Sequence, residues 1–124
     1  MGLFVIENIS AQEISNYGDI TIKAKHVTLN KFTNQLLLKK DLQISFGNFS
    51  LYGNSAILSY DEERLVIDGS PASMLSEKDE IKGTAKQFII YPNLSMEMLG
   101  DAQLVQDDQS IYAEKIIYQI SSND

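Results

Sequence analysis

Residues 51–72, LYGNSAILSYDEERLVIDGSPA, contain the unit from which the chain is built. Apolar residues alternate with other residues around Leu51 and again around Leu65 and Ile67, as they do in strands with one buried face. The polar residues 61–63 between the two runs have the composition of a turn. The stretch therefore predicts two antiparallel strands joined by a hairpin.

Segments that resemble the first half of this stretch recur about every thirty residues along the chain, the spacing of a repeat architecture. They read ITIKAKHVTLN, FSLYGNSAILSY, DEIKGTAKQFII and QSIYAEKIIYQI. Segments of a second type, QLLLKKDLQI, RLVIDGSPASM and SMEMLGDAQL, lie between them. Because Ile, Val, Leu, Tyr, Phe and Thr fill these runs with a period of two, we expect an all-β fold of short antiparallel strands.

Each segment of the first type has an apolar residue followed two places later by a small residue. The apolar residues are Ile22, Leu51, Ile81 and Ile111. From Gly53 to the next apolar position, Ala56, is three places, and this odd step reverses the side-chain alternation. A bulge or sharp bend absorbs such a step, and a small residue leaves room for it. We therefore expect a V-shaped, folded β-jellyroll of stacked repeats with open edges at both ends. The predicted crease residues are Ala24, Gly53, Gly83 and Ala113.

The length of 124 residues fits one domain. We expect an N-terminal segment at residues 1–19, either a short helix or an edge strand, and a single β-jellyroll domain at residues 20–124. The net charge of -7 argues against nucleic acid as a partner and against docking on anionic membranes through bulk charge. With no cysteine, the chain has no disulfide, thiolate metal site or cysteine nucleophile.

The residues that catalysis requires do not form a recognisable pattern. His26 is the only histidine and lies among Lys and Thr, which is typical of a solvated surface residue. Ser70 lies in a Gly-Ser-Pro turn without a supporting histidine motif. The acidic runs at residues 61–63 and 107–108 lack the ordered ligand spacing of calcium loops and read as hairpin tips. We therefore expect no enzymatic activity, no metal and no cofactor.

The alternation also predicts which side chains face inward. These are Ile20, Ile22, Leu36, Leu38, Leu51, Leu65, Ile67, Ile81, Met96, Met98, Leu104 and Ile111. Such a set is compatible with an ordinary sandwich core and with a partly open crease that holds an apolar ligand. Two methionines in one inward row favour the second reading, because methionine adapts to varied apolar partners.

The ordered set of motifs resembles the OstA/LptA-like lipopolysaccharide-transport proteins over residues 20–120. The family pattern of an apolar residue, glycine, alanine and Tyr-Asp, followed by an apolar-x-Gly-x-Pro-Ala segment, is matched most clearly in residues 51–72. The later matching positions are Ile81, Gly83, Ala85, Gly100, Asp101 and Ala102. Lys40 and Lys86 depart from the pattern, since they replace a glycine and an apolar residue.

The resemblance implies a periplasmic carrier or bridge that shields the acyl chains of lipopolysaccharide in an apolar crease on the way to the outer membrane. The family's lipid-contacting interior positions match Ile20, Ile22, Met74, Met96 and Met98 in this sequence. The resemblance also implies same-fold partners that join by edge-to-edge strand addition, and head-to-tail self-association. The net negative charge indicates that the domain as a whole does not grip lipid phosphates. We expect a periplasmic location, although the apolar run at residues 3–6 is too short to be a signal peptide.

Two other functions remain open from the sequence. The chain could be the same-fold periplasmic domain of a membrane-anchored or outer-membrane transport partner. It could also be a structural or adaptor β-module with a closed, dry core and no lipid.

Overall fold

The computed structural model describes residues 20–91 and 95–119, which form eight strands and contain no helix. The strands are β1 (Thr21–Lys23), β2 (His26–Asn30), β3 (Gln35–Phe46), β4 (Phe49–Ser59), β5 (Arg64–Ser76), β6 (Ile81–Ile90), β7 (Ser95–Gln106) and β8 (Gln109–Gln119). None of the described residues form a helix long and apolar enough to span a membrane. The all-β prediction is confirmed, whereas the expectation for residues 1–19 lies outside the described residues.

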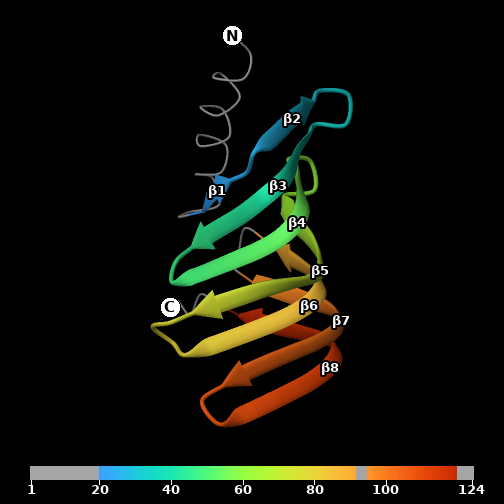
Figure 1. Cartoon of the computed structure of the whole chain (residues 1–124). Coiled ribbons are helices and arrows are strands. Elements are labelled where there is room, and N and C mark those ends of the chain that lie inside the picture. Colours follow the sequence, from blue (N-terminus) through green and yellow to red (C-terminus); the bar gives the residue numbers. More distant parts are fainter. Residues whose placement is uncertain (1–19, 92–94, 120–124) are drawn as a thin grey trace.

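The strands form one antiparallel sheet in the order β1-β3-β4-β5-β6-β7-β8, with β2 also paired to β3. Figure 1 shows the strands following one another in chain order, from β1 and β2 at the top to β8 at the bottom. The sheet does not close on itself, so β1 and β2 form one edge and β8 forms the other. Open edges at both ends are therefore confirmed.

Tight turns join consecutive strands at the polar runs that the sequence predicts as hairpin tips. Residues 61–63, 77–80 and 107–108 are turns between neighbouring antiparallel strands. Glu63, Glu80 and Asp107 adopt positive φ angles of 54°, 56° and 55°, which close these hairpins.

Every strand pair from β3 to β8 has a register shift near its middle, and these shifts divide the sheet into two halves. Half A comprises residues 26–30, 35–39, 55–59, 64–68, 87–90, 95–99 and 115–119. Half B comprises residues 21–23, 42–46, 49–53, 72–76, 81–85, 102–106 and 109–113. Buried residues of both halves belong to one hydrophobic cluster, so the sheet is folded over on itself.

The strands cross the crease in different ways. In β4, the odd step from Gly53 to Ala56 reverses the alternation, as the sequence predicts. In β3, the chain turns at Lys40 and Asp41, whose φ angles are 72° and 52°. In β7, Gly100 and Asp101 have the corresponding φ angles of 85° and 48°. A positive φ at Lys40 shows that the lysine adopts the backbone conformation for which the family pattern has a glycine.

The predicted crease residues lie at different distances from the bend. Ala24 lies between β1 and β2, and Gly53 lies at the register shift of β4. Ala113 belongs to the last regular pair, with Ala102, before the register shift of β8. Gly83 is not in the crease, because it pairs regularly with Met74 and the shift in β6 begins only after Thr84. The bend of β6 follows Ala85, which pairs regularly with Ala72 and continues the inward row for one more position.

The apolar interior as candidate ligand site

The predicted inward residues lie between the two halves of the sheet. Eleven of the thirteen, including Met74, are at most 6% exposed, so most of the interior is packed. These eleven are Ile20, Leu36, Leu38, Leu51, Leu65, Ile67, Met74, Ile81, Met96, Met98 and Leu104. Ile22 is half-buried against the same cluster.

Ile111 differs from the other predicted interior residues because it is 49% exposed. It pairs with Leu104, whose side chain is buried, and directly paired residues point to the same face of a sheet. Its side chain therefore lies on the interior face, but β8 is the last strand and no described strand covers it from the far side.

Several interior residues are missing from the predicted set although simple alternation would have found some of them. Leu42, Ile44 and Ala102 continue the inward rows of Leu36 and Met98 across the bend. The other additional members of the buried cluster are Phe49, Ala56, Leu58, Ala72, Ala85, Phe88 and Ile90. Together they make the interior apolar on both halves, with no charged side chain in the cluster.

Gly83 has an interior role although it is not at the bend. A Cβ atom added there would lie 2.9 Å from the Cε atoms of both Met74 and Met98. The missing side chain therefore provides the space that the two methionine ends occupy. Since methionine is unbranched and flexible, the two side chains can adjust their packing here.

One aromatic contact joins the two halves across the interior. The rings of Phe49 in half B and Tyr118 in half A are 5.8 Å apart at an interplanar angle of 72°, an edge-to-face arrangement. Burial, followed by the negative charge of Asp79, raises the pKa of the Tyr118 hydroxyl. The ring pair therefore connects the two halves at this position. The raised pKa favours the neutral form of the tyrosine.

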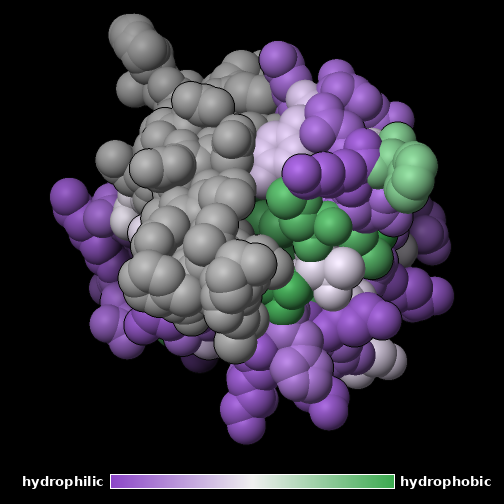
Figure 2. Space-filling view, turned by 90° about the horizontal axis from the view of Figure 1, so that it is seen from above, coloured by the Kyte–Doolittle hydropathy of each residue, from purple (hydrophilic) through white to green (hydrophobic). Residues whose placement is uncertain are grey.

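The interior is partly exposed at the edge formed by β1 and β2. Ile22, Val27 and Leu29 are half-buried and pack against the core. Figure 2 looks down on this end of the molecule and shows apolar residues near its centre, with hydrophilic residues above, below and to the right of them. The apolar surface between the halves therefore reaches solvent at this edge, as it does near Ile111 at the other.

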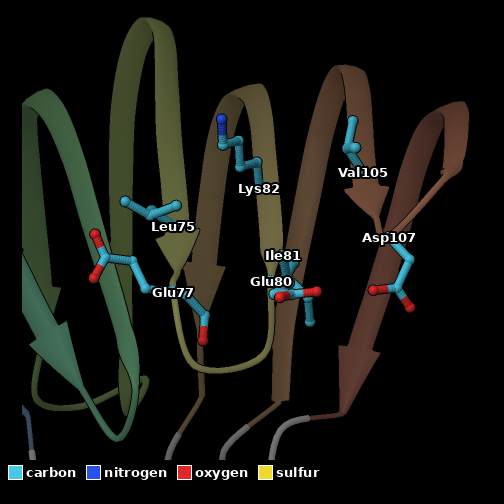
Figure 3. Close-up of a pocket in the computed structure, with 8 residues that line it drawn as sticks. Leu75, Glu77, Glu80, Ile81, Lys82, Val105 and Asp107 are labelled. Atoms are coloured by element: carbon cyan, nitrogen blue, oxygen red, sulfur yellow. The ribbon is translucent and has the colours of Figure 1, made fainter.

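A separate pocket of ≈ 400 Å³ lies at the β5–β6 hairpin and the end of β7. Leu75, Lys82 and Val105 are paired side by side across three strands and line it, and Glu77, Glu80 and Asp107 surround it (Figure 3). This depression is outside the predicted interior, apart from Ile81 on its wall.

The residues considered for catalysis and metal binding are not assembled into such sites. Within residues 20–91 and 95–119, no three His, Cys, Asp or Glu side chains are grouped as metal ligands. His26 is exposed on β2, and Ser70 is exposed in the bend of β5.

Comparison with known proteins agrees with this fold. The family described as LptA/(LptD N-terminal domain) LPS transport protein matches residues 21–124. The chain belongs to this family. No curated protein matches the chain. Among solved structures, it is similar to LptH of Pseudomonas aeruginosa, described as the LptA-homologous periplasmic component of the lipopolysaccharide transport device, with a TM-score of 0.73. The two are 21% identical over 85% of this chain and 79% of LptH.

Family membership confirms the resemblance drawn from the motifs at residues 51–72 and beyond. The similarity to LptH confirms the folded β-jellyroll, since at this identity it bears on the fold alone.

Proposed function

We propose that this domain carries lipopolysaccharide in the periplasm, with the acyl chains between the two sheet halves and the sugars outside. The observation that carries the proposal is the continuous apolar interior, which extends from Ile22 at one edge to Ile111 at the other. Membership of a lipopolysaccharide-transport family supports it, as does the fold shared with a periplasmic component. The proposed role is that of a binding module without a catalytic step.

Loading such a carrier requires the two halves to separate, because most interior side chains are packed in this structure. Burial of acyl methylenes provides about 0.8 kcal/mol each, so ten carbons contribute roughly 8 kcal/mol before entropic costs. That energy has to exceed the cost of parting contacts such as Phe49 with Tyr118. The flexible ends of Met74 and Met98 make the region around Gly83 the easiest to open.

The two open edges are the proposed docking sites for same-fold partners and for head-to-tail self-association. β8 has 11 residues and pairs along only one side with a described strand, β7. Ile111, Tyr112 and Ile117 expose much of their side chains along it. An unpaired strand of this length presents free N–H and C=O groups to an incoming strand.

The packed interior also favours a second candidate, an adaptor module that binds partners at its edges and no lipid. In that case, the residues between the halves serve as an ordinary core. The two candidates differ in whether lipid reaches the inward side chains, so site-specific crosslinking separates them.

The test uses a photo-crosslinking amino acid at inward positions that are not fully buried, so that the fold tolerates it. Ile22 and Ile111 are such positions. Their neighbours Thr21 and Tyr112, which point to the opposite face and are exposed, are the matched controls. The protein is illuminated with lipopolysaccharide present, and adducts are detected with an antibody against the sugar chain.

We expect adducts at both inward positions and at neither control. Equal labelling at all four positions would contradict an interior lipid site. Adducts at none of them, with a folded protein that still associates through its edges, would establish the adaptor instead.

A further inference from the structure

The charge of the molecule is distributed very unevenly along the chain. Residues 20–40 contain five of the ten basic residues, all lysines, and none of the seventeen acidic ones. This segment therefore has a charge of +5 while the remaining residues together have -12. The overall charge of -7 conceals a cationic region that coincides with β1, β2 and the first half of β3.

The lysines of this region flank the interior on both halves of the sheet. Lys23 lies in half B next to the inward Ile22, and its side chain is exposed on the outer face. Lys39 lies in half A, paired with His26, and is likewise exposed.

Few carboxylates neutralise these side chains. Lys25 forms an exposed ion pair with Asp41, at 3.3 Å between Nζ and Oδ2. Within residues 20–91 and 95–119, no carboxylate lies within ion-pair distance of Lys23 or Lys39. Lys23 and Lys39 are therefore not neutralised by any carboxylate of the described residues.

Apolar side chains reach the surface at the same edge of the sheet as these lysines. Ile22, Val27 and Leu29 are half-buried there, and Figure 2 shows hydrophilic residues above, below and to the right of the apolar centre. The opposite edge combines an apolar opening at Ile111 with the acidic residues 107, 108 and 114 and a single lysine, Lys115. The two ends of the interior are therefore alike in apolarity and opposite in charge.

We infer that the edge formed by β1, β2 and β3 is a binding site for the phosphate groups of the lipid whose acyl chains enter the interior. Lys23 and Lys39 contact the phosphates from the two sides of the opening, and Ile22, Val27 and Leu29 contact the first methylenes. This inference rests on the proposed function, and it specifies at which end of the interior the lipid headgroup lies. An apolar centre with a cationic rim is complementary to an anionic amphiphile.

The experiment compares the binding of lipopolysaccharide with that of the same preparation after enzymatic dephosphorylation. The test variant is the double substitution Lys23→Gln and Lys39→Gln, which leaves the paired Lys25 and the positive-φ Lys40 unchanged. The control variant is Lys82→Gln with Lys115→Gln, two exposed lysines on β6 and β8. Thermal unfolding verifies that both variants are folded.

The test variant should bind the phosphorylated lipid about tenfold more weakly than the wild type, since it loses two lysine charges whose attraction to phosphate is partly screened by salt. It should bind the dephosphorylated lipid as the wild type does. The control variant should match the wild type with both lipids. Millimolar inorganic phosphate should not displace the lipid, because free phosphate lacks the acyl chains that hold it at the opening.

Several results would overturn the inference while leaving the carrier function intact. These are equal binding of both lipids by the wild type, equal loss in test and control variants, and displacement by inorganic phosphate. If the test variant instead loses only salt-sensitive self-association in sedimentation, the lysines bind the acidic end of a second copy. If the wild type binds neither lipid, the proposed function itself fails.

Discussion

Replacing Gly53 and Gly83 by alanine should have unequal costs, although both residues occupy the same place in the repeat. A Cβ at Gly53 would lie 2.7 Å from Ile67 Cγ2 and 2.8 Å from the carbonyl oxygen of Asp68. Because that oxygen belongs to the backbone of the paired strand, β5 itself would have to move. At Gly83, the nearest atoms are the flexible ends of Met74 and Met98, each at 2.9 Å.

The expected magnitudes follow from these neighbours. Overpacking against a rigid partner costs about 1–3 kcal/mol, and we expect Gly53→Ala to lower the free energy of unfolding by roughly 2 kcal/mol. For Gly83→Ala, movement of two methionine ends is partly offset by the lower chain entropy of the unfolded alanine variant, so roughly 0–1 kcal/mol remains. Valine at either position should cost more than alanine.

Urea unfolding measured by circular dichroism tests this order, with the slope against urea verifying that the unfolded states are comparable. The matched control is Gly47→Ala, where a Cβ would meet no atom within 4 Å and any cost comes from the φ of 57°. A Gly83→Ala variant that loses more stability than Gly53→Ala would refute the assignment of the two glycines.

Two further predictions concern the backbone and a titrating side chain. Lys40→Gly should raise the free energy of unfolding by about 0.5–1 kcal/mol, because Lys40 has a φ of 72° that glycine adopts without strain. Lys39→Gly, on the regular part of the strand, is the control and should lower the free energy of unfolding. A loss of stability at both positions would contradict the bend geometry. Burial, and then the charge of Asp79, raises the pKa of Tyr118 in the folded protein. The neutral Tyr118 side chain therefore contributes its full stabilisation below the ordinary tyrosine pKa of about 10, and this contribution is lost as the pH rises through the higher pKa of the folded state. Tyr118→Phe should therefore weaken the decline in stability above about pH 10, as followed by urea unfolding across that range, and an unchanged decline would exclude this group as its cause.

Residue alternation sufficed to predict the strands and much of the interior. Ile20, Met96 and Met98 belong to runs in which every second residue is apolar, and all three are buried. The odd step after Gly53 likewise predicts the bend of β4, because a reversal of alternation has few other structural causes.

Other features depend on neighbours that a local pattern does not reveal. Lys40 and Asp41 turn the chain without a glycine, so composition does not mark the bend of β3. The position of Gly83 in the repeat suggested a crease, but Ala85 extends the inward row and displaces the bend of β6. Alternation assigns Ile111 to the correct face but does not indicate that β8 ends the sheet and leaves it exposed.

The carrier account requires the packed halves to move apart when acyl chains enter, and a distance between the halves tests this most directly. Spin labels at Lys82 in half B and Glu97 in half A, which alternation places on the outer faces, report the separation. Labels at Lys82 and Ser110, both in half B, form the control pair. On addition of lipopolysaccharide, the account predicts a longer distance for the first pair and no change for the second, whereas bound lipid with both distances unchanged would contradict it.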